Sequence, residues 1–95
     1  MIGFVNICHE DYVDDNAINM AETAVDSLTA RGIEVFAVPG PVTNHINAQA
    51  AGKALLQADV DGVIIFMGTW IECPNAMSVI REVEHLPMCL WGFGM

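Results

Sequence analysis

The sequence predicts a three-layer, doubly wound α/β domain of the Rossmann or flavodoxin type, with a four-stranded parallel sheet. Segments of strand and helix character alternate along the chain with short joints, which is typical of parallel strands linked by right-handed crossovers. The strand segments are nearly continuous apolar runs, as expected for a sheet covered on both faces. The 95 residues form a single domain, residues 1–95, and we expect the strand order 2-1-3-4.

The first strand and helix occupy the first third of the chain. Residues 2–8 form the strand, because apolar side chains dominate that run. Asp14 or Asp15 can cap the next helix, since a short carboxylate accepts hydrogen bonds from the free N–H groups of the first turn. Arg31 suits the negative end of this helix, and Gly32 suits a left-handed stop. The buried stripe of the helix is expected at Ala17, Met20, Ala21, Ala24, Val25 and Leu28.

The second strand, second helix and third strand continue the alternation. Residues 33–38 form the second strand, which ends at the Pro-Gly-Pro sequence of residues 39–41. Thr43 or Asn44 opens the second helix, since both side chains are good caps. Residues 62–67 form the third strand, the most apolar of the four. The apolar positions of the second helix are expected at Ile46, Ala50, Ala54 and Leu55.

The third helix and fourth strand complete the predicted domain. Pro74 fits the first turn of a helix, where its missing N–H costs nothing, and the helix runs to about His85. Residues 88–91 form the fourth strand, and Leu90 and Trp91 then lack a following helix to cover them. Either another subunit covers this edge, or the chain is the N-terminal part of a longer enzyme, and we favour the second explanation.

Composition excludes several classes of partner. Twelve acidic residues oppose Arg31, Lys53 and Arg81, which gives a net charge of −9. Nucleic acid and anionic membrane surfaces are therefore unfavourable partners, because their phosphates would be repelled. The longest apolar run, residues 63–67, is far short of the about 20 residues that span a bilayer. A basic N-terminal segment of the kind found in secretory signals is absent, so we expect a cytoplasmic protein.

The three cysteines do not form a disulfide framework or a C-x-x-C motif. An odd number of thiols suits a reducing compartment. Cys8 and Cys89 fall in strands and are expected to be small core residues. Cys73 precedes Pro74 at a helix start, a position that can activate a thiol. A thiol enzyme is nevertheless the weakest functional hypothesis, because Arg81 comes too late to close over a phosphate as it would in a phosphatase-like loop.

The best place for chemistry is the point where the strand order reverses, between strands one and three. Two loops meet there, residues 9–15 and residues 68–73. The first is rich in carboxylates and can be read as a cation-binding loop or, more simply, as a solvated acidic loop with a helix cap. In the second, Trp70 is either a stacking platform for a sugar or a packed rim residue, and Glu72 either binds hydroxyl groups or favours a helix N-terminus. Neither a dinucleotide fingerprint nor a P-loop is present.

Residues 60–70, followed by Pro74, a helix and residues 86–91, resemble the N-terminal domain of the L-fucose and L-arabinose isomerase family. The matching sequence is Val-Asp-Gly-Val-Ile-Ile-Phe-Met-Gly-Thr-Trp, then Leu-Pro-Met-Cys-Leu-Trp after the helix. Residues 2–8 and 33–40 fit the same Rossmann-like domain, so the resemblance spans essentially the whole chain. The family consists of metal-dependent aldose–ketose isomerases that usually take manganese and are several times longer than this chain.

The resemblance implies a substrate-covering role and no metal site in this chain, because the family's metal ligands lie in later domains. It implies that Trp70 contacts the sugar, with Thr69 and Glu72 beside it in the same loop. His9 and Glu10 stand where the family often has a basic or amide side chain, so the identity of the sugar is open. Other domains or subunits of an oligomer would complete the pocket.

Two functional hypotheses remain. In the first, the chain is the substrate-covering domain of a fucose- or arabinose-type isomerase, contributes sugar contacts but no catalytic residue that the sequence identifies, and is inactive alone. In the second, it is a stand-alone α/β binding or oligomerisation module with a polar-ligand site between strands one and three. A reading frame that continues into further domains favours the first, and a natural stop after Met95 favours the second.

Overall fold

The computed structural model of the chain describes residues 1–8, 15–38, 41–67 and 73–92. The strands within these ranges are β1 (Ile2–Ile7), β2 (Val35–Ala37), β3 (Gly62–Met67) and β4 (Met88–Gly92). The helices are α1 (Asp15–Ala30), α2 (His45–Gln57) and α3 (Cys73–Val83). Strands and helices alternate along the chain, which confirms the predicted α/β class.

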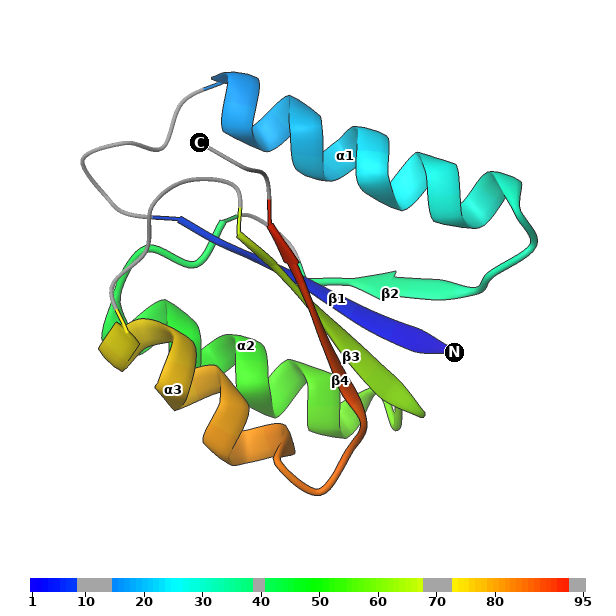
Figure 1. The fold of residues 1–95 in the computed structure, drawn as a ribbon. Helices are drawn as coiled ribbons and strands as arrows, with labels where there is room; N and C mark the ends of the chain where they lie inside the picture. Colours follow the sequence, from blue (N-terminus) through cyan, green and yellow to red (C-terminus); the bar gives the residue numbers. More distant parts are fainter. Residues whose placement is uncertain (9–14, 39–40, 68–72, 93–95) are drawn as a thin grey trace.

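The sheet has the order β2-β1-β3-β4, and every neighbouring pair of strands is parallel. This order confirms the sequence prediction, and it places the reversal of strand order between β1 and β3. Figure 1 shows the three layers: α1 covers one face of the sheet, and α2 and α3 lie side by side on the other. No helix in the described ranges is long and apolar enough to cross a bilayer.

The second strand is shorter than the predicted residues 33–38. Only Val35–Ala37 pair with β1, because the residues before them complete the turn that ends α1. The Ile33 amide donates to the Leu28 carbonyl at 3.2 Å, and Gly32 has the left-handed φ of +85° that was predicted for the helix stop. Ile33, which the sequence pattern assigns to the strand, therefore belongs to the turn after α1.

Successive side chains of the central strands β1 and β3 point to opposite faces of the sheet, and this alternation divides the core into two parts. Val5, Ile7, Val63 and Ile65 point toward α2 and α3, where they pack against Leu55 and other buried side chains. On the opposite face, Phe4 and Phe66 pack beneath Ala21 and Ala24 of α1, as the predicted stripe of α1 requires. Their ring centroids lie 5.3 Å apart. α1 alone covers one face of the sheet, whereas α2 and α3 together cover the other (Figure 1). Space is therefore left on either side of α1.

The predicted apolar face of α2 is partly wrong. Ile46 is 77% exposed, and Ala50 is exposed as well. The buried positions are Ala48, Ala51, Gly52 and Leu55, at helical spacing. Most of these residues are small, because α2 packs closely against α3: a Cβ atom on Gly52 would lie 2.6 Å from the Cβ atom of Glu82. Close approach of two helices, and not hydrophobicity, selects this face.

The two strand-region cysteines also differ from each other. Cys8 is fully buried, as predicted, and its thiol lies 3.4 Å from the carboxamide oxygen of Asn6. Cys89 is exposed, so its assignment to the core is wrong. Its register partner Ile64 shows that Cys89 faces the α1 side of the sheet, where it lies on the edge strand β4.

Candidate functional site

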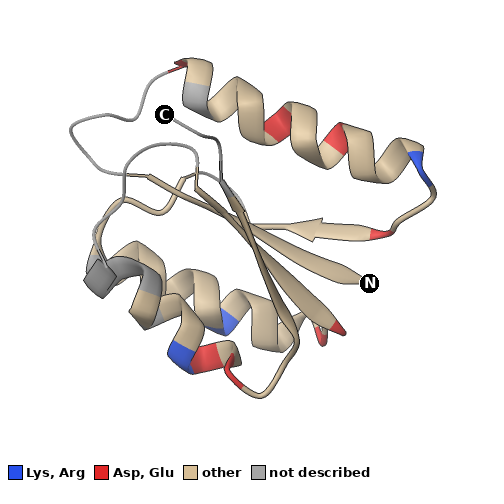
Figure 2. Ribbon diagram, in the orientation of Figure 1, with Lys and Arg blue, Asp and Glu red and all other residues tan. Residues whose placement is uncertain are grey.

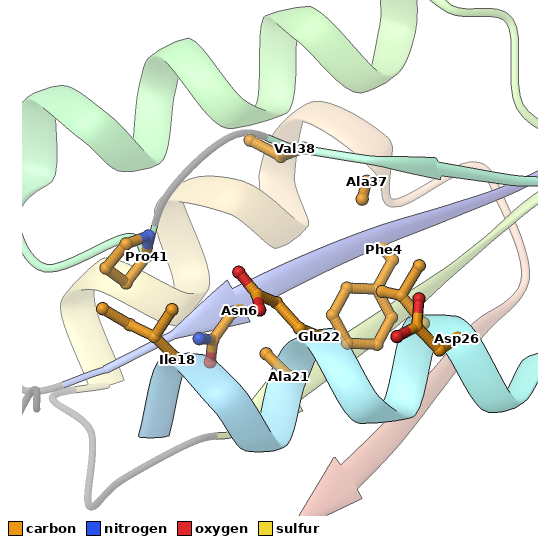
Figure 3. A pocket seen from close by; sticks show the side chains of 10 residues that line it. Phe4, Asn6, Ile18, Ala21, Glu22, Asp26, Ala37, Val38 and Pro41 are labelled. Atoms are coloured by element: carbon orange, nitrogen blue, oxygen red, sulfur yellow. The ribbon is translucent and has the colours of Figure 1, made fainter. Parts of the chain in front are cut away.

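A pocket of about 270 Å³ lies between α1, β1 and the end of β2. Figure 3 shows its arrangement: Asn6 of β1 and Glu22 of α1 lie near its centre, Asp26 lies at one end near Phe4, and Pro41 lies at the other. The pocket therefore sits near the carboxyl ends of β1 and β2, the side of the sheet where open α/β folds bind ligands. It does not lie at the reversal of strand order between β1 and β3, where the sequence predicted a site.

Asn6 is the polar centre of the pocket. It lies on β1 between the buried residues Val5 and Ile7 and is itself only 6% exposed. Its carboxamide oxygen accepts from the Cys8 thiol at 3.4 Å, and its backbone carbonyl accepts from the Val42 amide at 2.7 Å. These contacts fix the strand and orient the side chain. Burial of a carboxamide in an apolar strand costs free energy unless its polar atoms find partners, so the position is one at which a bound ligand can be recognised.

Two carboxylates form the wall contributed by α1. Glu22 and Asp26 stand four residues apart and so share one face of the helix. Both are exposed to solvent, and none of the described residues that line the pocket is basic. The wall therefore accepts hydrogen bonds from hydroxyl or ammonium groups and repels phosphates and carboxylates.

The remaining surface of the pocket is largely apolar. Phe4, which is 2% exposed, supplies an aromatic ring, and Ile18, Val25, Val38 and Pro41 supply aliphatic surface. Because Phe4 is almost fully buried, the apolar surface open to a ligand is mainly aliphatic. Such a surface with a few converging polar groups can hold a ligand that has both C–H and O–H surfaces. The pocket thus combines an apolar surface with an amide and two carboxylates.

A second, more open groove lies on the other side of α1, between that helix and Trp91 of β4. Its α1 wall carries the neutral side chains of Asn16, Asn19, Thr23 and Ser27. Two of these groups bond within the helix: the Asn16 carboxamide donates to the Met20 sulfur at 3.5 Å, and the Thr23 hydroxyl donates to the Asn19 carbonyl at 2.9 Å. Trp91 packs edge-on against Phe66, with ring centroids 5.6 Å apart. Because two of these four polar side chains already bond within the helix and none is charged, the groove is the weaker candidate.

The residues that the sequence nominated for sugar contact are His9, Glu10, Thr69, Trp70 and Glu72, and all five lie outside the described residues. Cys73 begins α3, but its side chain is likewise outside the described part. Their roles stay predictions. Asp15 begins α1, consistent with an acidic helix start.

Sequence reasoning missed the three polar residues of the pocket. Asn6 is the one polar side chain in the apolar run of β1, and that interruption is the signal that could have found it. Glu22 and Asp26 carry a weaker signal, a pair of carboxylates four residues apart next to the buried stripe of α1. Nothing local in the sequence shows that these two segments face each other.

Metal binding finds no support among the described side chains, where no three His, Cys, Asp or Glu residues gather in a way that could hold an ion. The carboxylates of Glu22 and Asp26 form only a pair.

The parallel sheet of order 2-1-3-4 is a Rossmann-like topology. Such topologies serve many unrelated functions, so function must be argued from the site. No family model, curated protein or solved structure matches this chain.

Proposed function

We propose that this chain is a sugar-binding α/β domain that contributes substrate contacts to a metal-dependent aldose–ketose isomerase of the fucose or arabinose type. The observation that carries the proposal is the pocket beside β1, in which Phe4, Asn6, Glu22 and Asp26 converge. The resemblance of residues 60–91 to the N-terminal domain of that enzyme family supports the same class of ligand.

Each part of the pocket matches a part of a sugar. The half-buried aliphatic side chains of Ile18, Val25 and Val38 offer an apolar surface for the C–H groups of a sugar. Asn6 donates to ring or hydroxyl oxygens. The carboxylates of Glu22 and Asp26 accept from hydroxyl groups. A volume of about 270 Å³ lies just below the range of roughly 300–1,000 Å³ typical of drug-sized ligands, which suits a monosaccharide.

The charge of the pocket further limits which ligands it can bind. The pocket wall is acidic and the chain carries a net charge of −9. A sugar phosphate would meet like charges at close range, which is unfavourable. We therefore propose a free sugar as the ligand.

The reaction in this proposal interconverts an aldose and a ketose by moving hydrogen between C1 and C2. A divalent metal, when bound by other parts of the enzyme, polarises the sugar oxygens. This chain holds and orients the sugar. His9, Glu10, Thr69, Trp70 and Glu72 are the further sugar contacts that the family resemblance implies. The chain alone forms no ketose.

A second candidate is a stand-alone α/β module that binds a small polar ligand. The lining of the pocket, an amide and two carboxylates beside aliphatic surface, suits such a ligand as well. The two candidates differ in their dependence on other domains. Sugar binding by the chain with no catalysis fits both, whereas ketose formation on addition of the remaining domains identifies the isomerase.

The first experiment is an amide NMR titration of the chain with L-fucose and L-arabinose, and with an aldose phosphate for comparison. Glu22→Gln and Asp26→Asn remove the pocket charges at exposed positions, so the fold is retained. Glu84→Gln is the matched control, because Glu84 is equally exposed but lies just after α3 on the opposite face. Hydrogen bonds to a charged group contribute about 1.5–3 kcal/mol, so each pocket variant weakens sugar binding about tenfold or more.

The expected result is that free sugars shift the amides of β1, α1 and residues 37–42, that the phosphate does not, and that only the pocket variants lose affinity. An equal loss of sugar affinity in the Glu84→Gln control would contradict sugar binding in this pocket. Amide shifts confined to a different part of the sheet would contradict it as well. Saturating sugar without any amide shift contradicts sugar binding by this chain.

A further inference from the structure

The two ends of the Asn6 carboxamide lie in different surroundings. Its oxygen accepts a hydrogen bond from the Cys8 thiol at 3.4 Å, whereas none of the described residues accepts one from its nitrogen, Nδ2. Every fully buried side-chain nitrogen or oxygen in the described part of the chain has a partner, so Nδ2 belongs to the small accessible part of this residue. Asn6 is 6% exposed and lines the pocket (Figure 3). The pocket therefore contains a donor that is available to a ligand.

The backbone holds Asn6 and Cys8 in fixed positions. Cys8 directly follows β1 and stands two residues after Asn6, so the two side chains point to the same face of the sheet. The Val42 amide donates to the Asn6 carbonyl at 2.7 Å, and the Cys8 amide donates to the Val42 carbonyl at 2.8 Å. Cys8 is also fully buried. The contact between thiol and carboxamide is therefore set by the sheet and is shielded from water.

Hydrogen bonding, and not shape, decides which end of the carboxamide faces the pocket. The oxygen and the NH₂ group are similar in size, and a half-turn about the Cβ–Cγ bond exchanges an acceptor for a donor. The S–H group of Cys8 can donate to the carboxamide in only one of the two orientations, the one in which the oxygen is turned toward the thiol. This orientation leaves the NH₂ group for the pocket.

The charge of α1 favours the same orientation. Figure 2 shows acidic residues along α1 and a basic residue only after its end. Glu22 and Asp26 belong to the wall of the pocket, so their carboxylates attract the NH₂ end of the Asn6 dipole and repel its oxygen end. The thiol on one side of the carboxamide and the carboxylates on the other therefore act in the same direction.

We propose that Cys8 is a positioning residue, whose thiol holds the Asn6 oxygen so that Asn6 presents its NH₂ donor to the ligand. The pocket then combines one donor with the acceptors of Glu22 and Asp26, which fits an uncharged polyol that offers an ether or hydroxyl oxygen beside hydroxyl groups. In the opposite orientation these three side chains would all be acceptors and would favour an ammonium group. The inference rests on the proposed sugar-binding function for its ligand, but not for the orientation of Asn6.

NMR of the free protein tests the orientation without any sugar. Nuclear Overhauser effects from the Nδ2 protons of Asn6 are expected to reach side chains of the pocket, such as Ile18, and not the β protons of Cys8. In Cys8→Ala the oxygen loses its donor, so the Nδ2 protons are expected to contact both the pocket and the side chain at position 8. Nδ2 protons that lie against Cys8 in the parent overturn the proposal, and so does an unchanged pattern in Cys8→Ala.

Sugar titration then compares Cys8→Ser with Cys8→Ala, using L-fucose and L-arabinose. Both substitutions remove the sulfur at a fully buried position and so lose packing, but only serine retains a donor. Cys8→Ser is expected to bind sugar within about twofold of the parent, and Cys8→Ala about fivefold more weakly, which equals the roughly 1 kcal/mol of a neutral hydrogen bond. Cys89→Ala, at an exposed cysteine that does not line the pocket, is the control and leaves the affinity unchanged. Circular dichroism verifies that the variants fold.

A purely structural role of Cys8 gives a different result from a positioning role. It would lower the melting temperature of both variants and leave them with equal sugar affinity, which overturns the proposal. A parent chain that binds no sugar contradicts the proposed function instead. The orientation of Asn6 in the free parent, which needs neither a variant nor a ligand, then decides the role of Cys8 by itself.

Discussion

Gly52 shows how a single residue determines the distance between two helices. A Cβ atom at this position of α2 would lie 2.6 Å from both the Cβ and the Cγ atoms of Glu82. The first of these is attached directly to the α3 backbone and cannot swing away. Glycine is therefore required here by space, whereas at Gly32 it is required by the left-handed backbone, with φ +85° and open surroundings.

We expect Gly52→Ala to destabilise the protein. Alanine gains about 1 kcal/mol of helix propensity over glycine, but overpacking costs about 1–3 kcal/mol, so the net loss is about 1 kcal/mol. Urea unfolding measures it. Glu82→Gly removes both clashing atoms, so Gly52→Ala costs less in that background. An equal cost in the two backgrounds would show that the contact with Glu82 is not the cause.

At the scale of elements, α2 begins with a cap that the sequence predicts. Asn44 has extended backbone angles, and its side chain accepts a hydrogen bond from the Asn47 amide at 2.9 Å. This bond satisfies one of the free N–H groups of the first turn. The cap fixes where α2 starts, and so helps fix the register of Ala48 and Leu55 against the sheet.

Asn44→Ala is therefore expected to lower the free energy of unfolding by about 1 kcal/mol, whereas Asn44→Asp retains the acceptor and costs little. Urea unfolding of the two variants makes the comparison. If aspartate destabilises as much as alanine, the Asn44 side chain does not act as a cap.

At the scale of the whole molecule, the chain start is tied to the turn before β3, sixty residues away. The amino group of Met1 donates to the Asp61 carboxylate at 2.8 Å. This hydrogen bond, assisted by the opposite charges, raises the pKa of the amino group and lowers the pKa of Asp61. The pair joins β1 to the segment that leads into its neighbour β3.

The pair stabilises the fold only between these two pKa values. The raised pKa of the amino group gives a contribution that is present at neutral pH and lost as pH rises through that pKa. The lowered pKa of Asp61 gives one that is lost as pH falls through the acidic range. We expect the melting temperature of Asp61→Asn to lie slightly below that of the parent at neutral pH, and the difference to vanish in acid, in alkali and at high salt. A difference independent of pH and salt contradicts the ion pair.

Local sequence rules by themselves determined the order of the elements and the topology of the sheet. The apolar strands, the cap at Asn44 and the stop at Gly32 depend on residues a few positions apart, and right-handed crossovers leave few ways to arrange the strands. The residues at which helices and strands begin and end were less predictable. Ile33, for example, completes the turn after α1 instead of joining β2.

Only the tertiary structure decided which surfaces meet. The face of α2 that is buried follows from its close approach to α3, which favours Gly52 over Ile46. The pocket likewise joins Asn6 to Glu22 and Asp26, which are brought together by the packing of α1 on β1. Cys89 is exposed on β4, which lies at the edge of the sheet. Such contacts depend on the distances between packed elements, which short-range patterns in a sequence do not specify.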